Sequence, residues 1–219
     1  MNVLVAALQV QADPQVLDNL GILYIKSGRL QEARKVYRQL FNQFSQYQDG
    51  KIHYAQLLLQ ERSFEEAESA LLSVIKGNQS FQDAYHQLAL LYTHINRSAE
   101  GLERILQAIK LCSSTEKSCA QLYVCHGDIL KDLKDLNAAA QSYNLAVQID
   151  PNIAHAHLNL GVIHHLQGRY NEALKHYQSA QNLDPNNPVV VENMKKLRKQ
   201  VFKSSPRECV GDSATCRTC

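Results

Sequence analysis

Histidines and cysteines are the residues of this 219-residue chain whose spacing could support chemistry. The histidines gather near the C-terminal end, at His155, His157, His164, His165 and His176. A helical metal site needs two ligands four residues apart and an accompanying carboxylate. No two of these histidines are four apart, and His157 and His164 are seven apart, which places them on one helix face. We interpret them as structural histidines and predict neither a metal nor another cofactor.

The cysteines fall into two groups. Cys209, Cys216 and Cys219 form a C-x6-C-x2-C pattern near the end of the chain, which lacks the fourth ligand of a structural zinc site. Cys112 and Cys119 flank a short insertion and are candidates for a disulfide across that loop if the compartment is oxidising. The sequence contains no nucleotide-binding loop, catalytic carboxylate pair or nucleophile–base motif. We therefore predict no catalytic residue, and that this chain is not itself an enzyme.

Composition excludes several classes of partner. The chain has 23 Lys and Arg against 21 Asp and Glu, a net charge of +2, which is too small to drive nucleic-acid or acidic-membrane binding. No apolar run approaches the roughly 18 residues that a membrane span needs. The first residues have no basic region of the kind that precedes a signal-peptide core. We expect no nucleic acid partner and no membrane contact by this chain itself.

A period of 34 residues runs through the sequence. Small residues recur at Ala33, Ala67, Gly101, Ala139 and Ala173, with steps of 34, 34, 38 and 34 residues. The clearest unit has Leu-Gly at 160–161, Gly168, Tyr170, Tyr177 and Pro185. This pattern resembles the tetratricopeptide (TPR) repeat, in which a small residue in each of two helices lets them approach closely.

The resemblance implies an all-α fold, a right-handed TPR α-solenoid of about five helix-turn-helix repeats plus a C-terminal capping helix. We place the repeats at about 14–47, 48–81, 82–115, 120–153 and 154–187, the capping helix at 188–203 and a disordered tail at 204–219. Residues 1–12 are interpreted as the second helix of a truncated repeat, with Val3 and Ala6 in register with Tyr37 and Leu40. Because that segment is apolar rather than a polar cap, we expect a C-terminal fragment or isoform of a longer repeat protein.

In a TPR stack the first helix of each repeat lines a concave groove. The second and sixth positions of each repeat give a predicted partner-binding row of Gln15, Asn19, Asp49, His53, Asp83, Gln87, Gln121, Cys125, His155 and Asn159. Amide side chains in such a row can hydrogen-bond the backbone of an extended peptide, whereas the alternative is a solvated polar face. We predict binding of a protein or an extended peptide segment.

Chaperone-binding TPR domains use a clamp of Lys, Asn and Arg residues for a C-terminal carboxylate. The positions of that clamp hold Asp18 and Ile22 in the first repeat, His53 in the second, and Asp83 and Gln87 in the third. An acid and an apolar residue occupy the positions of the first pair, which is Lys and Asn in the clamp. We predict that this chain has no chaperone carboxylate clamp.

The last two repeats, residues 122–184, together with the irregular second repeat and the 38-residue step, resemble the C-terminal repeats of the transmembrane and TPR-repeat O-mannosyltransferases. In that family a membrane part carries the glycosyl transfer and the repeats face the lumen of the endoplasmic reticulum. The resemblance implies that the sequons at Asn78 and Asn96 are usable for glycosylation. A cytosolic TPR scaffold or assembly adaptor, with a cytoplasmic location, is the alternative.

Overall fold

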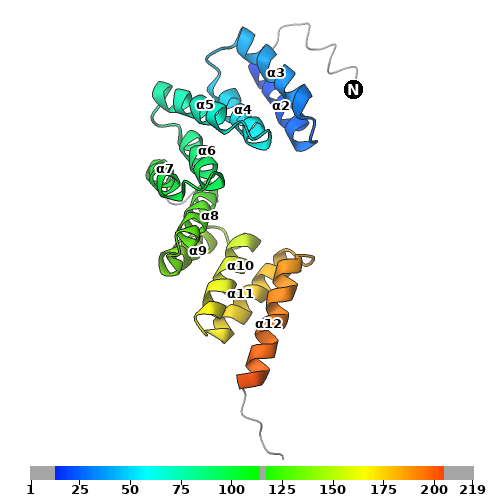
Figure 1. Ribbon diagram of the computed structural model, residues 1–219, viewed down its shortest axis with the longest axis vertical. Coiled ribbons are helices and arrows are strands. Elements are labelled where there is room, and N and C mark those ends of the chain that lie inside the picture. Colours follow the sequence, from blue (N-terminus) through cyan, green and yellow to red (C-terminus); the bar gives the residue numbers. More distant parts are fainter. Residues whose placement is uncertain (1–12, 114–116, 205–219) are drawn as a thin grey trace, which may run out of the picture. The chain divides into compact units, whose positions relative to one another are not determined.

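The computed structural model describes residues 13–113 and 117–204, and within them it contains eleven α-helices and no strand. The helices follow one another as pairs joined by short turns (Figure 1). The chain divides into two compact units, residues 1–150 and 151–219. This all-α arrangement of paired helices confirms the fold predicted from the repeat period.

The first unit contains four helix pairs. Their bounds are α2 Pro14–Lys26 with α3 Leu30–Gln43, α4 Gln48–Gln60 with α5 Phe64–Gly77, α6 Gln82–His94 with α7 Ser98–Leu111, and α8 Lys117–Asp132 with α9 Leu136–Ile149. Each helix of the first three pairs contacts both its partner and the next pair, and the first helices α2, α4, α6 and α8 contact one another in succession. Apolar side chains of neighbouring pairs therefore share successive core clusters, as expected for stacked repeats.

The second unit contains one helix pair and a further helix. α10 spans Ala154–Leu166, α11 spans Tyr170–Leu183, and α12 spans Pro188–Ser204. Val190, Met194 and Leu197 of α12 are buried with Ala180 and Tyr177 of α11 in one cluster. Lys195, Lys196, Arg198 and Lys199 on α12 are exposed. α12 therefore has one apolar and one basic face.

The turn inside every pair contains a residue in the left-handed conformation. Gly28 and Gly168 have φ values of +72° and +74°. The equivalent residues of the other repeats are Arg62, Asn96 and Lys134, with φ values of 60°, 61° and 68°. Such a residue ends a helix by turning its backbone, which is easy for glycine and costly for most other residues. The turn geometry is thus kept even where the glycine is not.

Three helix pairs are held at close range by a tyrosine that lies over a glycine. A Cβ added to Gly21 would be 2.5 Å from Cζ of Tyr37, and one added to Gly161 would be 2.5 Å from Cδ1 of Tyr177. Tyr143 occupies the corresponding space beside Gly127. The aromatic rings fill the volume of the missing side chains, so the glycines set the distance between the paired helices.

The insertion before the fourth repeat only partly forms a loop. We expected that repeat to begin at residue 120, but α8 begins at Lys117 and is 16 residues long. Cys119 is consequently a helical, buried residue. The segment Lys117–Ala120 contains no proline or glycine, so nothing in it prevents an early helix start.

Several expectations concern residues outside the described part of the chain. These are the interpretation of 1–12 as a second helix, the centre of the insertion at 114–116, and the disordered tail predicted at 204–219 with Cys209, Cys216 and Cys219, except for its first residue. That residue, Ser204, is described and ends α12, so the helix extends one residue beyond the predicted capping helix at 188–203.

The glycine under Tyr177 gives a test of this packing. In Gly161→Ala, overpacking against Tyr177 should lower the free energy of unfolding by about 1–3 kcal/mol. The higher helix propensity of alanine should offset roughly 1 kcal/mol of this loss. Gly77→Ala is the matched control, because its Cβ would approach only the flexible end of Gln48, at 3.1 Å. Urea unfolding followed by circular dichroism measures both. Equal stability of the two variants would contradict the close-packing explanation.

Candidate partner-binding groove

The first helices of the first unit provide the surface on which most predicted binding residues lie. Gln15, Asp49, Asp83 and Gln121, at the second position of successive repeats, are all exposed. At the sixth position, Asn19 is exposed, whereas His53 and Gln87 are half-buried. In the second unit, His155 on α10 is exposed. These side chains therefore lie at least partly at the surface.

Two residues of the predicted row lie in the interior instead. Cys125 is 4% exposed and belongs to a cluster with Ala89 and Ile129. Burial, with the charge of Asp128, raises the pKa of its thiol to about 12, so it is a poor nucleophile at neutral pH. Asn159 is 7% exposed, and its Nδ2 donates to Nε2 of His155 at 2.9 Å. Both side chains present little surface to a partner.

A buried carboxylate joins the first two repeats beneath the groove. Asp18 of α2 is 0% exposed. The hydroxyl of Tyr37 donates to its Oδ1 at 3.2 Å, and Nδ1 of His53 lies 2.9 Å from its Oδ2. A carboxylate only accepts hydrogen bonds, so this Nδ1 carries the proton. Burial and the negative charge of Asp18 raise the pKa of Tyr37. Asp18 thereby fixes the orientation of His53, a predicted groove residue.

An open cleft with an apolar lining lies between α4 and α6, and the repeat pattern alone did not predict it. Leu59 and Gln60 line it from the end of α4, Arg62 from the following turn, and Leu90 and His94 from α6. Leu90 is exposed and lies three residues beyond Gln87, on the same side of its helix. Extending the predicted row by one turn would have found it. The cleft can hold an apolar side chain beside a cationic Arg62.

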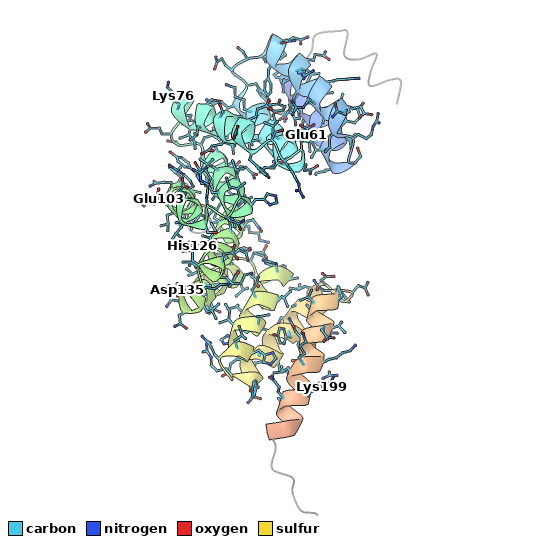
Figure 2. All side chains as sticks on the ribbon, viewed as in Figure 1. Glu61, Lys76, Glu103, His126, Asp135 and Lys199 are labelled. Carbon is cyan, nitrogen blue, oxygen red and sulfur yellow. A yellow bond between two sulfur atoms is a disulfide. The ribbon has the colours of Figure 1, made fainter. Side chains whose placement is uncertain are left out.

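Arginine–glutamate contacts join successive repeats away from the predicted row. The guanidinium of Arg34 binds Glu61. Glu61, labelled in Figure 2, directly follows α4. Arg97 contacts Glu100 at 2.5 Å and Glu68 at 3.3 Å, and the hydroxyl of Tyr92 donates to Glu68 at 2.6 Å. The hydrogen bond to Glu100, with the negative charges of Glu68 and Glu100, raises the pKa of Arg97. These charged side chains bind each other, which reduces the charge left for a ligand.

The histidines of the second unit form a stack between α10 and α11. His176 lies against His157 and His164, with ring centroids 5.5 and 5.3 Å apart. Nε2 of His157 donates to the carbonyl of Pro151 at 3.0 Å, so its Nδ1 accepts from Nδ1 of His176 at 3.2 Å. Across the described ranges, no group of three His, Cys, Asp or Glu residues is arranged to hold a metal ion.

The two sequons and the cysteine pair lie in loops or at helix ends of the first unit. Asn78 and Asn96 are exposed, and Oδ1 of Asn78 accepts from the backbone N–H of Ser80 at 3.0 Å. The Cα atoms of Cys112 and Cys119 are 5.9 Å apart, and their sulfur atoms are bonded to each other. This Cα separation is typical of a disulfide. Among the described helices, none combines the length and apolarity that crossing a membrane requires.

Comparisons with known families and proteins agree with this geometry. Models of the tetratricopeptide repeat match residues 20–97 and 154–187, and a TPR repeat model matches residues 127–168. The human Protein O-mannosyl-transferase TMTC1 is 29% identical over 191 residues, which are 87% of this chain and 22% of that protein. The mouse protein of the same name is 31% identical over 147 residues, 67% of this chain and 16% of that protein. The chain spans about a fifth of the length of these relatives.

Solved structures share the fold at low sequence identity. PilF of Pseudomonas aeruginosa superposes with a TM-score of 0.79 at 15% identity, covering 87% of this chain and 84% of that one. The TPR protein TTC0263 of Thermus thermophilus has a TM-score of 0.68 at 15% identity, covering 87% and 100%. YrrB, a TPR protein with an unusual peptide-binding site, has a TM-score of 0.60 at 16% identity, covering 88% and 97%.

The histidine stack predicts a pH-dependent stability. Burial, with the charges of His157 and His164, lowers the pKa of His176 from 6.5 to about 4. The unfolded chain therefore binds more protons than the folded one between these values, so stability is full above pH 6.5 and decreases as the pH falls towards 4. Arg169 and Glu172 act on the neighbouring His164 in opposite directions.

His176→Val, which reproduces Val36 at the same repeat position, should weaken this dependence. Urea midpoints measured from pH 7.5 to 4 for both proteins provide the comparison. The parent protein should lose more stability than the variant across this range. Parallel pH profiles would show that His176 does not titrate as described.

Proposed function

We propose that this chain, which belongs to the tetratricopeptide repeat proteins, is the non-catalytic partner-binding array of an O-mannosyltransferase-like protein of the endoplasmic reticulum. In this proposal it corresponds to the C-terminal repeats of a longer membrane protein, whose glycosyl-transfer chemistry resides in another part. The similarity to TMTC1 over 87% of the chain is the observation that carries the assignment. TPR repeats themselves are protein-interaction modules, which is the part of the function that does not depend on this relative.

The groove of the first unit is the surface that we assign to the partner. Its exposed Gln15 and Asn19 offer amide groups to an extended backbone, and Gln87 does so beside the apolar cleft at Leu59 and Leu90. An extended peptide whose amides bind the row and whose apolar side chain enters the cleft uses both features. The peptide-binding site of YrrB, which shares the fold, supports the same kind of ligand.

The two sequons and the cysteine pair support a location in the lumen of the endoplasmic reticulum. Both sequon asparagines are exposed, and the cysteine pair has a geometry suited to a disulfide, which persists in an oxidising compartment. The bridge would tie the end of α7 to the start of α8 across the insertion.

Photo-crosslinking tests the groove and the compartment together. A benzoylphenylalanine replaces Gln87 in the groove or, as the matched control, Glu103 on the second helix α7 (Figure 2). The chain is produced in human cells either behind a secretory signal or without one. We expect discrete crosslinked proteins at position 87, at least fivefold more than at 103, and only for the secreted form. Crosslinks of equal intensity at both positions would contradict the assignment of the groove as the partner-binding surface.

The same samples show whether the two sequons are glycosylated and whether Cys112 and Cys119 form a disulfide. The secreted form should gain two mobility steps that an endoglycosidase removes, one lost in Asn78→Gln and one in Asn96→Gln, and its Cys112 and Cys119 should resist alkylation before reduction. Crosslinks at position 87 only in the cytosolic form, with an unmodified secreted form, would instead support a cytosolic scaffold.

A further inference from the structure

The second unit has an open cleft of its own, between α10 and α12 and beside the start of α11. Its volume is about 500 Å³, within the range of clefts that hold ligands in other proteins. α12 lines one side of it with Asn193, Lys196 and Gln200. These three residues are three and four positions apart, so they form one stripe along the helix.

The α10 side of the cleft offers apolar surface to a ligand. Leu166 lines it, and the side chain of Leu166 is 69% exposed. Val162 and Tyr170 line the cleft beside it and are half-buried. An apolar group that covers Leu166 removes this surface from water, which favours binding.

Three helices meet at His165, another lining residue of the cleft. Its ring lies edge-on to the rings of Tyr170 and Tyr177, with centroids 5.9 and 6.3 Å apart. An amide oxygen only accepts, so Nε2 of His165 donates to Oε1 of Gln200, and its Nδ1 accepts from the hydroxyl of Tyr177 at 3.5 Å. Because α11 and α12 both hold this ring, the cleft is formed before a ligand arrives, which lowers the cost of binding.

The α12 side gives the cleft a positive charge. Lys196 lines it, and Lys199 is exposed one turn further along the helix (Figure 2). None of the described residues that line the cleft is acidic. Glu192 pairs with Lys196 at 3.8 Å, but both side chains are more than half exposed, and an ion pair at such a site is weak. A carboxylate on a ligand can therefore replace Glu192 at Lys196, with the amide of Asn193 as a second donor.

The cleft between α4 and α6 in the first unit has different chemistry at the equivalent positions. There the ninth and thirteenth residues of α6 are Leu90 and His94, whereas those of α12 are Lys196 and Gln200. A lysine in place of a leucine changes the ligand that fits from an apolar group to an apolar group with an acid beside it.

We propose that the cleft between α10 and α12 is a further peptide-binding site, which takes an acidic and a large apolar side chain two positions apart in an extended segment. Side chains at this spacing lie on the same side of an extended chain, so both enter the cleft. Lys196 and Asn193 bind the carboxylate. Leu166, Val162 and Tyr170 contact the apolar side chain. The inference does not rest on the proposed function, which assigns the groove of the first unit.

An array of hexapeptides with blocked termini tests the site, with the full chain as the probe. Each peptide combines Glu, Gln or Lys with Leu, Phe or Ser at a spacing of one, two or three positions. We expect the chain to bind peptides that have Glu two positions from Leu or Phe. Lys196→Glu should reverse the charge preference, so that peptides with Lys replace those with Glu.

The best peptide is then measured in solution by fluorescence anisotropy. Lys196→Gln and Leu166→Ala should each weaken its binding about tenfold. Lys199→Gln and Leu183→Ala are the matched controls, because both residues are exposed and neither lines the cleft. Each control should change the affinity less than about twofold.

Peptide binding that is unaffected by both Lys196→Gln and Leu166→Ala would place the peptide elsewhere, such as in the groove of the first unit, and would overturn the proposal. Preference for Glu that persists in Lys196→Glu would do the same. Binding only of peptides with a free C-terminus, or only of phosphatidylserine vesicles, would assign the cleft to a different ligand.

Discussion

The contact on which the other features depend is a large side chain filling the space left by a small one on the neighbouring helix. Tyr37 over Gly21 and Tyr177 over Gly161 set the separation inside helix pairs. Leu40 against Gly50 sets it between pairs. Because a helix pair buries little apolar surface alone, its stability comes from these interfaces. The left-handed turn residues follow from the same constraint, since each pair must return its second helix along the first.

The polar contacts are arranged on this apolar frame. Asp18 is buried completely and still has its hydrogen bonds satisfied, because Tyr37 and His53 reach it from two different helices. One of these partners belongs to the next repeat, so the network joins the two repeats and orients a groove residue. A buried carboxylate with its partners removed is strongly destabilising, which gives this junction little tolerance for change.

Much of this architecture could be predicted from the sequence. The 34-residue period identified the helix pairs, because glycine and alanine at fixed spacing are needed for close approach. The degree to which individual side chains are buried was harder to predict. Cys125 and Asn19 share a repeat position, yet Cys125 is buried and Asn19 is exposed, because only Cys125 has a preceding repeat beside it among the described residues. The cleft at Leu59 and Leu90 was missed because it combines the ends of two helices from different repeats.

Residues of successive repeats stabilise each other directly beneath the groove, through the contact between Asp18 and His53. A double-mutant cycle of Asp18→Ala and His53→Ala, measured by urea unfolding of the full chain, tests it most directly. The account predicts a coupling of about 1–3 kcal/mol, because each side chain loses its partner when the other is removed. Free energies of unfolding that simply add, with the double variant as unstable as the sum of the single variants, would contradict it.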